Sequence, residues 1–210
     1  MIDQRNESRH VASDVAFTPS VKAVQSRKGS RASYARMEVG AGWQTTITEN
    51  LAEFIAAQTS IFLATASATG QPYIQHRGGP PGFLKVLDNK TIGFADFRGN
   101  RQFISMGNLA ENPRAHLFLL DYSTQQRIKL WGTAEIIEDD AALVARLMPP
   151  DYQAKSDQAL LFHINAWDAN CPQHIPQRLD AADVDRALKE RDSRIAVLES
   201  EIARLKLSRA

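Results

Sequence analysis

The chain has 210 residues, of which 43% are hydrophobic and 23% are charged, with a formal net charge of +1 at pH 7. These values are typical of a globular domain with an ordinary core, and they give no support for a nucleic-acid or membrane-surface partner that is bound through bulk charge. The single cysteine, Cys171, excludes an internal disulfide framework.

Residues 1–45 are expected to form an N-terminal arm with one short helix. Residues 1–16 are polar and have no secretory pattern, so we expect a cytoplasmic protein. The helix is predicted to begin at Pro19 and to stop at Gly29, because proline suits a first helical position and glycine suits a stop. A basic turn and a linker at residues 40–43 should follow. The basic residues near this turn are interpreted as a solvated face, with a phosphate site as the alternative; they are Arg27, Lys28, Arg31 and Arg36.

Residues 46–179 are predicted to form one mainly β domain with peripheral helices. A pattern of the capping-box type at Thr46 to Glu49 predicts a helix over residues 48–58, and Asp139 and Asp140 are expected to cap a second one that ends at Leu147. Period-two and apolar runs predict strands at residues 60–67, 72–77, 83–87, 91–97, 114–122, 126–138 and 160–167. Because most links have hairpin length, this order favours an antiparallel barrel over a doubly wound sheet.

A basic loop at residues 98–102 separates two of these elements. It follows the strand at 91–97 and leads into an apolar-periodic segment that resembles the start of a helix. Arg98 and Arg101 carry guanidinium groups, and a helix start adds backbone N–H groups and a favourable dipole. The loop is therefore predicted to bind an anion, with a phosphate as the first candidate.

The segment 180–210 differs from the rest of the chain, because apolar residues recur in it at alternating steps of four and three. Ile195 and Ile202 share one core position of a heptad, and Leu198 and Leu205 share the other. This arrangement favours a parallel two-stranded coiled coil. Arg191 interrupts the seam, and about three heptads are marginal for an isolated helix. Self-association is the preferred interpretation, and an amphipathic helix folded onto the barrel is the alternative.

The central segment resembles the flavin-binding part of the pyridoxamine 5′-phosphate oxidase-like family. The resemblance rests on Lys85, on the triplet Asn100–Gln102, on the segment 110–113 and on the strand 126–135, and it covers roughly residues 45–140. It implies an FMN-binding split β-barrel that forms a homodimer and holds FMN at the subunit interface. The segment 167–176 resembles a subgroup of uncharacterised flavoproteins in this family.

The resemblance and the residue chemistry together give a set of candidate cofactor-binding residues. These are Arg77, Lys85, Asn100, Arg101, Gln102, Arg127, Lys129, Trp131, Gln173 and His174. Of these, Asn100, Arg101 and Gln102 are the candidates for the FMN phosphate, because they combine a cation with hydrogen-bond donors.

Several of these candidates have a second interpretation. Lys85 either points into the site or extends along the surface with its head in water. Arg127 and Lys129 either reach the flavin or form the outward polar face of their strand. Trp131 either lies at the edge of the flavin or packs at the dimer interface.

The chain departs from the pattern of the vitamin B6 oxidases in three places. The arginine found five residues before the family's lysine is Pro80 here, and Arg77 is the candidate substitute. Gln102 replaces a phosphate-binding lysine, and the C-terminal Arg-x-His substrate motif is not visible. Oxidation of a B6 vitamer is therefore not expected.

The preferred function is that of an FMN-dependent oxidoreductase that moves electrons between a reduced donor, with NADH or NADPH as a candidate, and an unknown acceptor. No catalytic acid or base stands out, which also fits a non-catalytic flavin-binding or sensor protein, or an interaction protein that recruits a partner through its tail. The five histidines have no metal-binding spacing, so no metal site is expected.

Overall fold

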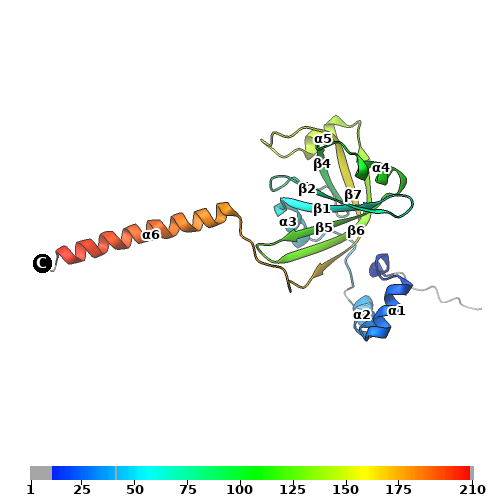
Figure 1. Cartoon of the computed structure of the whole chain (residues 1–210), viewed down its shortest axis with the longest axis horizontal. Coiled ribbons are helices and arrows are strands. Elements are labelled where there is room, and N and C mark those ends of the chain that lie inside the picture. Colours follow the sequence, from blue (N-terminus) through cyan, green and yellow to red (C-terminus); the bar gives the residue numbers. More distant parts are fainter. Residues whose placement is uncertain (1–10, 41, 209–210) are drawn as a thin grey trace, which may run out of the picture. The chain divides into compact units, whose positions relative to one another are not determined.

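A computed structural model describes residues 11–40 and 42–208 (Figure 1). The chain divides into two compact units. The first holds the chain up to Leu120 together with Arg127–Cys171, and the second holds Asp121–Gln126 with the segment from Pro172 onward. The predicted boundaries at residues 45 and 179 differ from this division and remain predictions. The expectations for residues 1–10 and for Ala41 fall outside the described residues.

One sheet of seven strands forms the frame of the first unit (Figure 1). Its spatial order is β2-β1-β5-β6-β7-β4-β3, and β1 with β2, β1 with β5, β3 with β4, β4 with β7 and β6 with β7 pair antiparallel. The strands are β1 (Ser60–Ala66), β2 (Pro72–Gly78), β3 (Lys85–Val86), β4 (Thr91–Phe97), β5 (Arg114–Asp121), β6 (Gln126–Ile137) and β7 (Ser156–Asn170). This architecture confirms the predicted mainly β class with peripheral helices.

The core lies on the inward face of the alternating strands. Ile61 on β1, Leu117 on β5, Leu130 on β6 and Phe162 on β7 all have no exposed surface. Successive side chains of a strand point to opposite faces, so the alternation of apolar and polar residues places these side chains together. Burial of such side chains stabilises the fold by about 1.5–3 kcal/mol each.

Two strands differ in length from the prediction by more than one residue. The strand expected at residues 83–87 is paired only at Lys85 and Val86, because Phe83 and Leu84 precede it as loop residues whose side chains are buried in the core. The last strand, expected at 160–167, runs from Ser156 to Asn170 because it pairs with β4 near its start and with β6 along its length.

Gly132 on β6 permits a close approach between two strands. The pairing of β6 with β7 shifts register between Trp131 and Gly132. A Cβ atom at Gly132 would lie 2.0 Å from the carbonyl oxygen of His163. Only glycine therefore fits this irregularity without displacing β7.

Three short helices border the sheet. In α3 (Glu49–Ala57), the cap is Thr48 and not the first threonine of the predicted pattern, since Oγ1 of Thr48 accepts a hydrogen bond from the N–H of Leu51 over 3.3 Å. Helix α5 (Ala141–Leu147) is capped by Asp140 alone, whose Oδ1 accepts from the N–H of Leu143 over 2.8 Å. Helix α4 (Ile104–Glu111) follows the basic loop as predicted.

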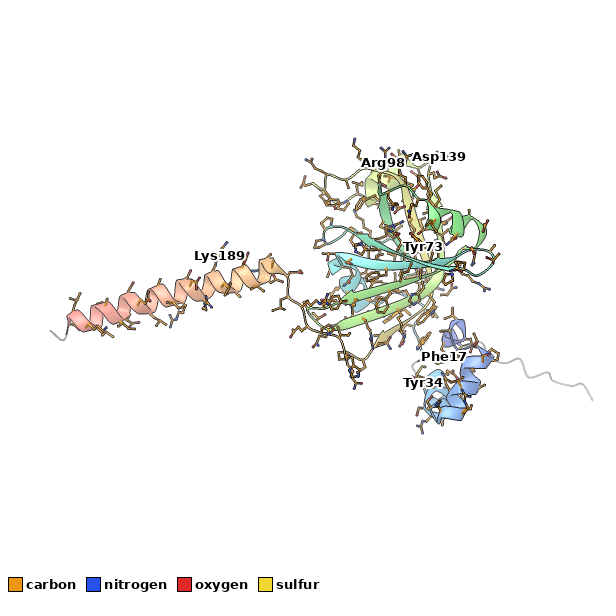
Figure 2. The ribbon with its side chains drawn as sticks, viewed as in Figure 1. Phe17, Tyr34, Tyr73, Arg98, Asp139 and Lys189 are labelled. Carbon is orange, nitrogen blue, oxygen red and sulfur yellow. The ribbon has the colours of Figure 1, made fainter. Side chains whose placement is uncertain are left out.

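The N-terminal segment contains a 3₁₀ turn, η1 (Ala12–Val15), followed by helices α1 (Pro19–Lys28) and α2 (Arg31–Val39). Helix α1 has the predicted limits, and Gly29 ends it with a φ of 82°. Helix α2 is a correction, because no helix was expected at residues 31–39, where only a basic turn was predicted ahead of the linker at residues 40–43. Phe17 and Tyr34 bring the segments together edge to face, with ring centroids 5.2 Å apart (Figure 2).

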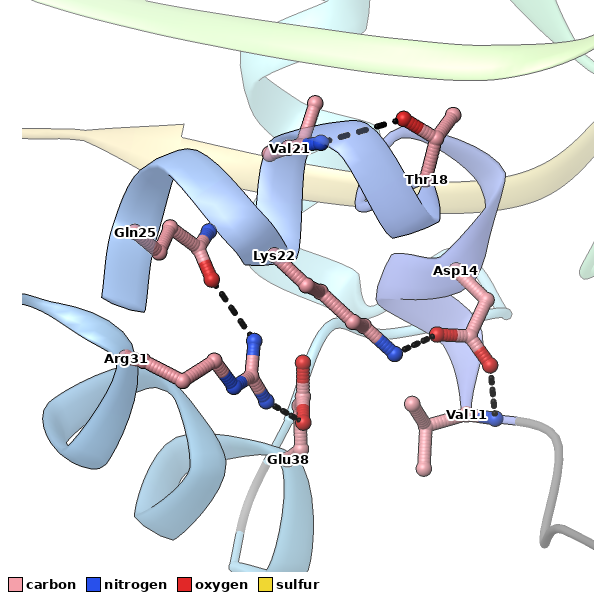
Figure 3. A network of polar contacts seen from close by, with 8 residues as sticks. All are labelled: Val11, Asp14, Thr18, Val21, Lys22, Gln25, Arg31 and Glu38. Carbon is pink, nitrogen blue, oxygen red and sulfur yellow. Dashed lines mark hydrogen bonds and ion pairs between the residues drawn. The ribbon is translucent and has the colours of Figure 1, made fainter. Parts of the chain in front are cut away.

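Polar contacts hold these N-terminal elements (Figure 3). Lys22 Nζ donates to Oδ1 of Asp14 over 2.6 Å, and Arg31 Nη1 donates to Oε1 of Gln25 over 2.6 Å. Arg31 also forms an ion pair with Glu38. The guanidinium of Arg31 is thus bonded to Gln25 and Glu38 within the N-terminal helices. At this residue, these contacts support neither of the two predicted interpretations, a solvated face or a phosphate site.

The second unit contains α6 (Ala181–Leu207), a continuous helix of 27 residues, none of which is buried. In the same unit, the Arg178 guanidinium lies 4.5 Å from the ring centroid of Tyr122. Within the described parts of the chain, no helix has both the length and the apolarity needed to cross a membrane.

Candidate functional site

A cavity of about 300 Å³ opens in the first unit between β2, the end of β4, the basic loop, the start of α4 and the start of β7. Its lining is rich in arginine, amide and carboxylate side chains. Four predicted site residues lie in it, namely Arg77, Asn100, Arg101 and Gln102.

Strand β2 forms one wall of this pocket through alternate residues. Tyr73, Gln75 and Arg77 are two positions apart and therefore project from the same face of the strand. The Tyr73 hydroxyl donates a hydrogen bond to Oε1 of Gln75. Along β2, this wall therefore lines the pocket with a phenol, then an amide and then a guanidinium group.

Asp96 lines the pocket and accepts hydrogen bonds from three other side chains. Its side chain accepts from Arg77 Nε at 2.7 Å and from Gln158 Nε2 at 2.8 Å. The Ser156 hydroxyl also donates to its backbone carbonyl over 2.8 Å. Because Asp96 is only 8% exposed, its charge needs these donors, and it neutralises Arg77 in return.

Arg98 and Asp157 form a two-pronged ion pair at the rim. Nε and Nη2 of Arg98 donate to the two carboxylate oxygens of Asp157 over 2.5 and 2.6 Å. Hydrogen bonding to Arg98 lowers the pKa of the Asp157 carboxyl, to which the charge of Arg101 also contributes, and the same pair raises the pKa of Arg98. Asp157 is therefore firmly ionised, and Arg98 is a neutralised cation.

Arg101 stands apart from the other two arginines. No carboxylate within the described residues forms an ion pair with it, and its guanidinium lies 5.7 Å from the ring centroid of Phe103. Both Arg101 and Phe103 have positive φ angles, of 60° and 54°. Strained backbone of this kind is found at ligand-binding loops, where it aims side chains and N–H groups.

The basic loop leads directly into the N-terminus of α4. The side-chain oxygen of Asn100 accepts a bond from the N–H of Gln102 over 3.3 Å, which closes the turn. Phe103 is the N-cap residue and offers no side-chain acceptor to the helix. The first N–H groups of a helix have no intrahelical partner, so this end can accept an anion.

The structure places Lys85 away from this cavity. Its Nζ donates to the carbonyl oxygens of Arg146 and Met148 over 2.8 and 3.2 Å, at the C-terminal end of α5. This contact suits the negative end of the helix dipole. The assignment of Lys85 to the flavin site remains a prediction.

Arg127, Lys129 and Trp131 lie on β6, outside the lining of the cavity. Trp131 stacks on Trp43 with ring centroids 4.5 Å apart, and Lys129 Nζ lies 5.2 Å from the centroid of Trp131. Lys129 also pairs with Asp168 at 3.4 Å. The proposed flavin contacts of these three residues remain predictions.

His116 packs edge-on against Trp131, with ring centroids 4.9 Å apart. Burial, and to a smaller extent the charge of Lys129, lowers the pKa of His116 to about 4. At neutral pH this imidazole is therefore uncharged.

Gln173 and His174 belong to the second unit, where His174 has a φ of 67°. Their predicted roles at the flavin also remain untested.

Several polar pocket residues were not predicted from the sequence, among them Tyr73, Gln75, Asp96, Asp157 and Gln158. The alternation along β2 could have indicated Tyr73 and Gln75, because they share a face with Arg77. Asp96 and Gln158 lie 62 positions apart, and no local pattern links them.

The arrangement is suited to binding an anionic ligand. Two of its arginines are neutralised by carboxylates, while Arg101, the surrounding amides and the start of α4 offer donors. Among the described residues, no group of three His, Cys, Asp or Glu side chains gathers as a metal site requires.

Comparison with known proteins identifies one family model, described as pyridoxamine 5′-phosphate oxidase, which matches residues 47–170. No curated protein matches the chain.

Several solved structures resemble the fold. HupZ of Group A Streptococcus is 18% identical, with a TM-score of 0.49, covering 63% of this chain and 99% of its own. A putative pyridoxamine 5′-phosphate oxidase from Lactobacillus delbrueckii is 20% identical, with a TM-score of 0.45 and coverages of 60% and 95%. An FMN-binding protein from Syntrophomonas wolfei is 13% identical, with a TM-score of 0.46 and coverages of 71% and 97%.

Proposed function

The chain belongs to the pyridoxamine 5′-phosphate oxidase family and has its split-barrel fold, and from this premise we propose that it binds FMN with the phosphate in the pocket between β2, the basic loop and α4. The observation that carries the proposal is Arg101, an uncommitted guanidinium beside the start of a helix. A phosphate dianion is neutralised well by such a cation together with backbone N–H groups.

The other pocket residues supply donors and shape. Asn100 and Gln102 would offer their side-chain amide N–H groups to the phosphate, and Tyr73 and Gln75 would line the side formed by β2. A volume of about 300 Å³ lies at the low end for ligand pockets. This size suits the phosphate end of FMN, and it supports a homodimer in which a second copy covers the remainder of the cofactor.

Bound FMN would supply two-electron chemistry, with transfer from a donor such as NADH or NADPH to an acceptor. The contribution of the protein would be binding, orientation and positive charge. We therefore propose an FMN-dependent oxidoreductase. A non-catalytic flavin-binding protein is the alternative, because the pocket contains ion pairs and amides that serve binding equally well.

The test is a titration of the purified chain with FMN, followed by the quenching of flavin fluorescence. Arg101→Ala should weaken FMN binding by about 10- to 100-fold, since it removes charge-assisted hydrogen bonds worth about 1.5–3 kcal/mol. Arg27→Ala is the matched control, because Arg27 is an exposed arginine on α1. Loss of binding in both variants, or in neither, would contradict the phosphate assignment.

Turnover is tested separately with the FMN-loaded protein. Oxidation of NADH or NADPH that exceeds the rate of free FMN supports the oxidoreductase. A protein that binds FMN tightly but does not exceed that rate, with these donors or with chemical reductants, supports the non-catalytic alternative.

A further inference from the structure

Helix α6 carries an apolar stripe that has no partner within the described residues. Its apolar seam residues are between 38% and 50% exposed, and they are Val184, Leu188, Ile195, Leu198, Ile202 and Leu205. No residue of the helix is buried. Figure 2 shows its side chains projecting on all sides, with Lys189 among the polar ones. A single helix with this stripe is marginal in water, so the stripe needs a partner.

The composition of the stripe is that of a two-stranded coiled coil. Leu188, Ile195 and Ile202 occupy the a positions of three heptads. Leu198 and Leu205 occupy d positions, with Val184 at the first d. β-Branched residues at a and leucine at d pack best between two parallel helices, because their side chains fit the holes of that geometry.

The flanking charges agree with a parallel pair. In that orientation, each g residue faces the e residue five positions later on the other helix. Arg194 at g then faces Glu199 of the second copy, and Glu201 at g faces Lys206. Both contacts join opposite charges, and the two-fold axis repeats each of them. The one like-charged contact, between Asp180 and Asp185, lies at the start of the helix.

The flanking charges alone do not choose between the two orientations. With the seam overlaid antiparallel so that Ile195 packs against Leu198 of the other copy, Asp192 at e lies opposite Glu199 at e, whereas Arg194 at g lies opposite Glu201 at g. The parallel assignment therefore rests on the β-branched residues at a and the leucines at d.

Arg191 is the single polar residue at d in the described helix. It already forms an ion pair with the neighbouring Asp192, at 2.8 Å. The Asp192 carboxylate thus offsets the positive charge of Arg191 at the edge of the apolar stripe. A polar residue at one core position also restricts the register and the number of strands.

We propose that α6 pairs in parallel with α6 of a second copy of this chain, through the seam from Val184 to Leu205. The pairing does not depend on flavin. It holds two copies of the chain together at high effective concentration, whatever contacts the barrels make.

Site-directed disulfide formation in the full-length chain tests this pairing. The background variant is Cys171→Ser, because Cys171 is exposed and free. In it, Leu198→Cys places a thiol at a d position, and Val197→Cys is the matched control one residue away, where the side chain is 57% exposed and outside the seam. Any dimer formed by the barrels brings both thiols near to the same extent.

We expect mild oxidation to link Leu198→Cys chains into covalent dimers at least about tenfold faster than Val197→Cys chains, because d residues of parallel helices face each other. Equal rates at the two positions would overturn the proposal. Failure of Leu198→Cys to link would do the same, since a helix that folds back or awaits another protein keeps the two thiols apart.

Charge reversal tests the orientation with the same readout. Arg194→Glu should slow the linking of Leu198→Cys on the order of fivefold, because it places two glutamates in contact. Adding Glu199→Arg should restore the rate. Rescue by Glu201→Arg in place of Glu199→Arg would indicate antiparallel helices and would overturn the parallel assignment.

Discussion

The Nε atom of Arg77 donates a hydrogen bond to Oδ1 of Asp96 over 2.7 Å, and this pair joins β2 to the end of β4 inside the pocket. The side chain of Asp96 is 9% exposed, whereas that of Arg77 is 21% exposed. The charge of Asp96, which has less access to water, therefore depends more on its partner than the charge of Arg77 does. Arg77 shapes the wall as part of a neutral pair, which leaves Arg101 as the cation available to an anionic ligand.

Replacement of Asp96 should destabilise the fold. Asp96→Ala leaves Arg77 and Gln158 without their acceptor in a partly buried site, so we expect a loss of about 1–3 kcal/mol in the free energy of unfolding. Urea denaturation monitored by circular dichroism measures this loss. Asp139→Ala is the control, because Asp139 is exposed (Figure 2) and should stay within about 0.5 kcal/mol of the wild type. Equal stability of the two variants would contradict the role of Asp96.

Neutralisation of Asp157 should strengthen FMN binding, if the pocket holds the phosphate. Asp157→Asn removes a firmly ionised carboxylate from the rim and releases Arg98, so the pocket becomes more positive. We expect the dissociation constant to fall about threefold at low salt, with the gain fading as salt screens the charges. Fluorescence titrations at two salt concentrations measure the effect. Weaker binding would show instead that Asp157 holds Arg98 in a position that the ligand requires.

Acidification should destabilise the protein through His116. Its folded pKa of about 4 lies below the ordinary value of 6.5, so between these values the unfolded chain binds the proton and the folded chain does not. The contribution of the neutral His116 to the free energy of unfolding is therefore complete above about pH 6.5, and it declines as the pH falls toward 4. Because the ring is partly exposed, we expect a loss of about 1–2 kcal/mol between pH 7 and pH 5.

Urea unfolding at these two pH values measures the loss, and His116→Phe should reduce it because that side chain keeps the ring contact with Trp131 but cannot titrate. NMR titration of the imidazole gives the pKa directly. A value near 6.5 would contradict the prediction.

Gly132→Ala should destabilise the sheet strongly. Its methyl group would lie 2.0 Å from the His163 carbonyl oxygen, so one strand must move and lose hydrogen bonds. We expect a loss of about 2–4 kcal/mol. Gly107→Ala on α4 is the contrasting control, since a Cβ there meets no atom within 4 Å. Alanine in a helix should raise the free energy of unfolding by about 0.5–1 kcal/mol relative to glycine. Equal melting temperatures would contradict this account of the β6 irregularity.

Much of the fold was predictable because its signals are local. Strands β1 and β5 were expected from apolar runs and β6 from alternation, and in the structure burial alternates along all three, which places their inward apolar side chains in the core. Helix α2 was missed, since Gly29 and Ser30 indicate a stop. In the structure the chain begins a new helix directly after them, and Arg31 and Tyr34 hold that helix through contacts with Gln25 and Phe17.

The candidate site was predictable only in part, for a related reason. Asn100, Arg101 and Gln102 are adjacent in the sequence and precede a helix, so their meeting in one pocket needs no distant contact. Asp96 and Asp157 reach the site through the pairing of β4 with β7, which no local pattern reveals.

The sequence was enough to establish the mainly β class, the basic loop and the heptad seam, because each depends on a period or motif within a few turns of chain. Only the tertiary structure decided which arginine is free. Arg77 is neutralised by a carboxylate 19 positions away, and Arg98 by one 59 positions away. Charge neutralisation depends on distance in space, and the folded sheet sets that distance.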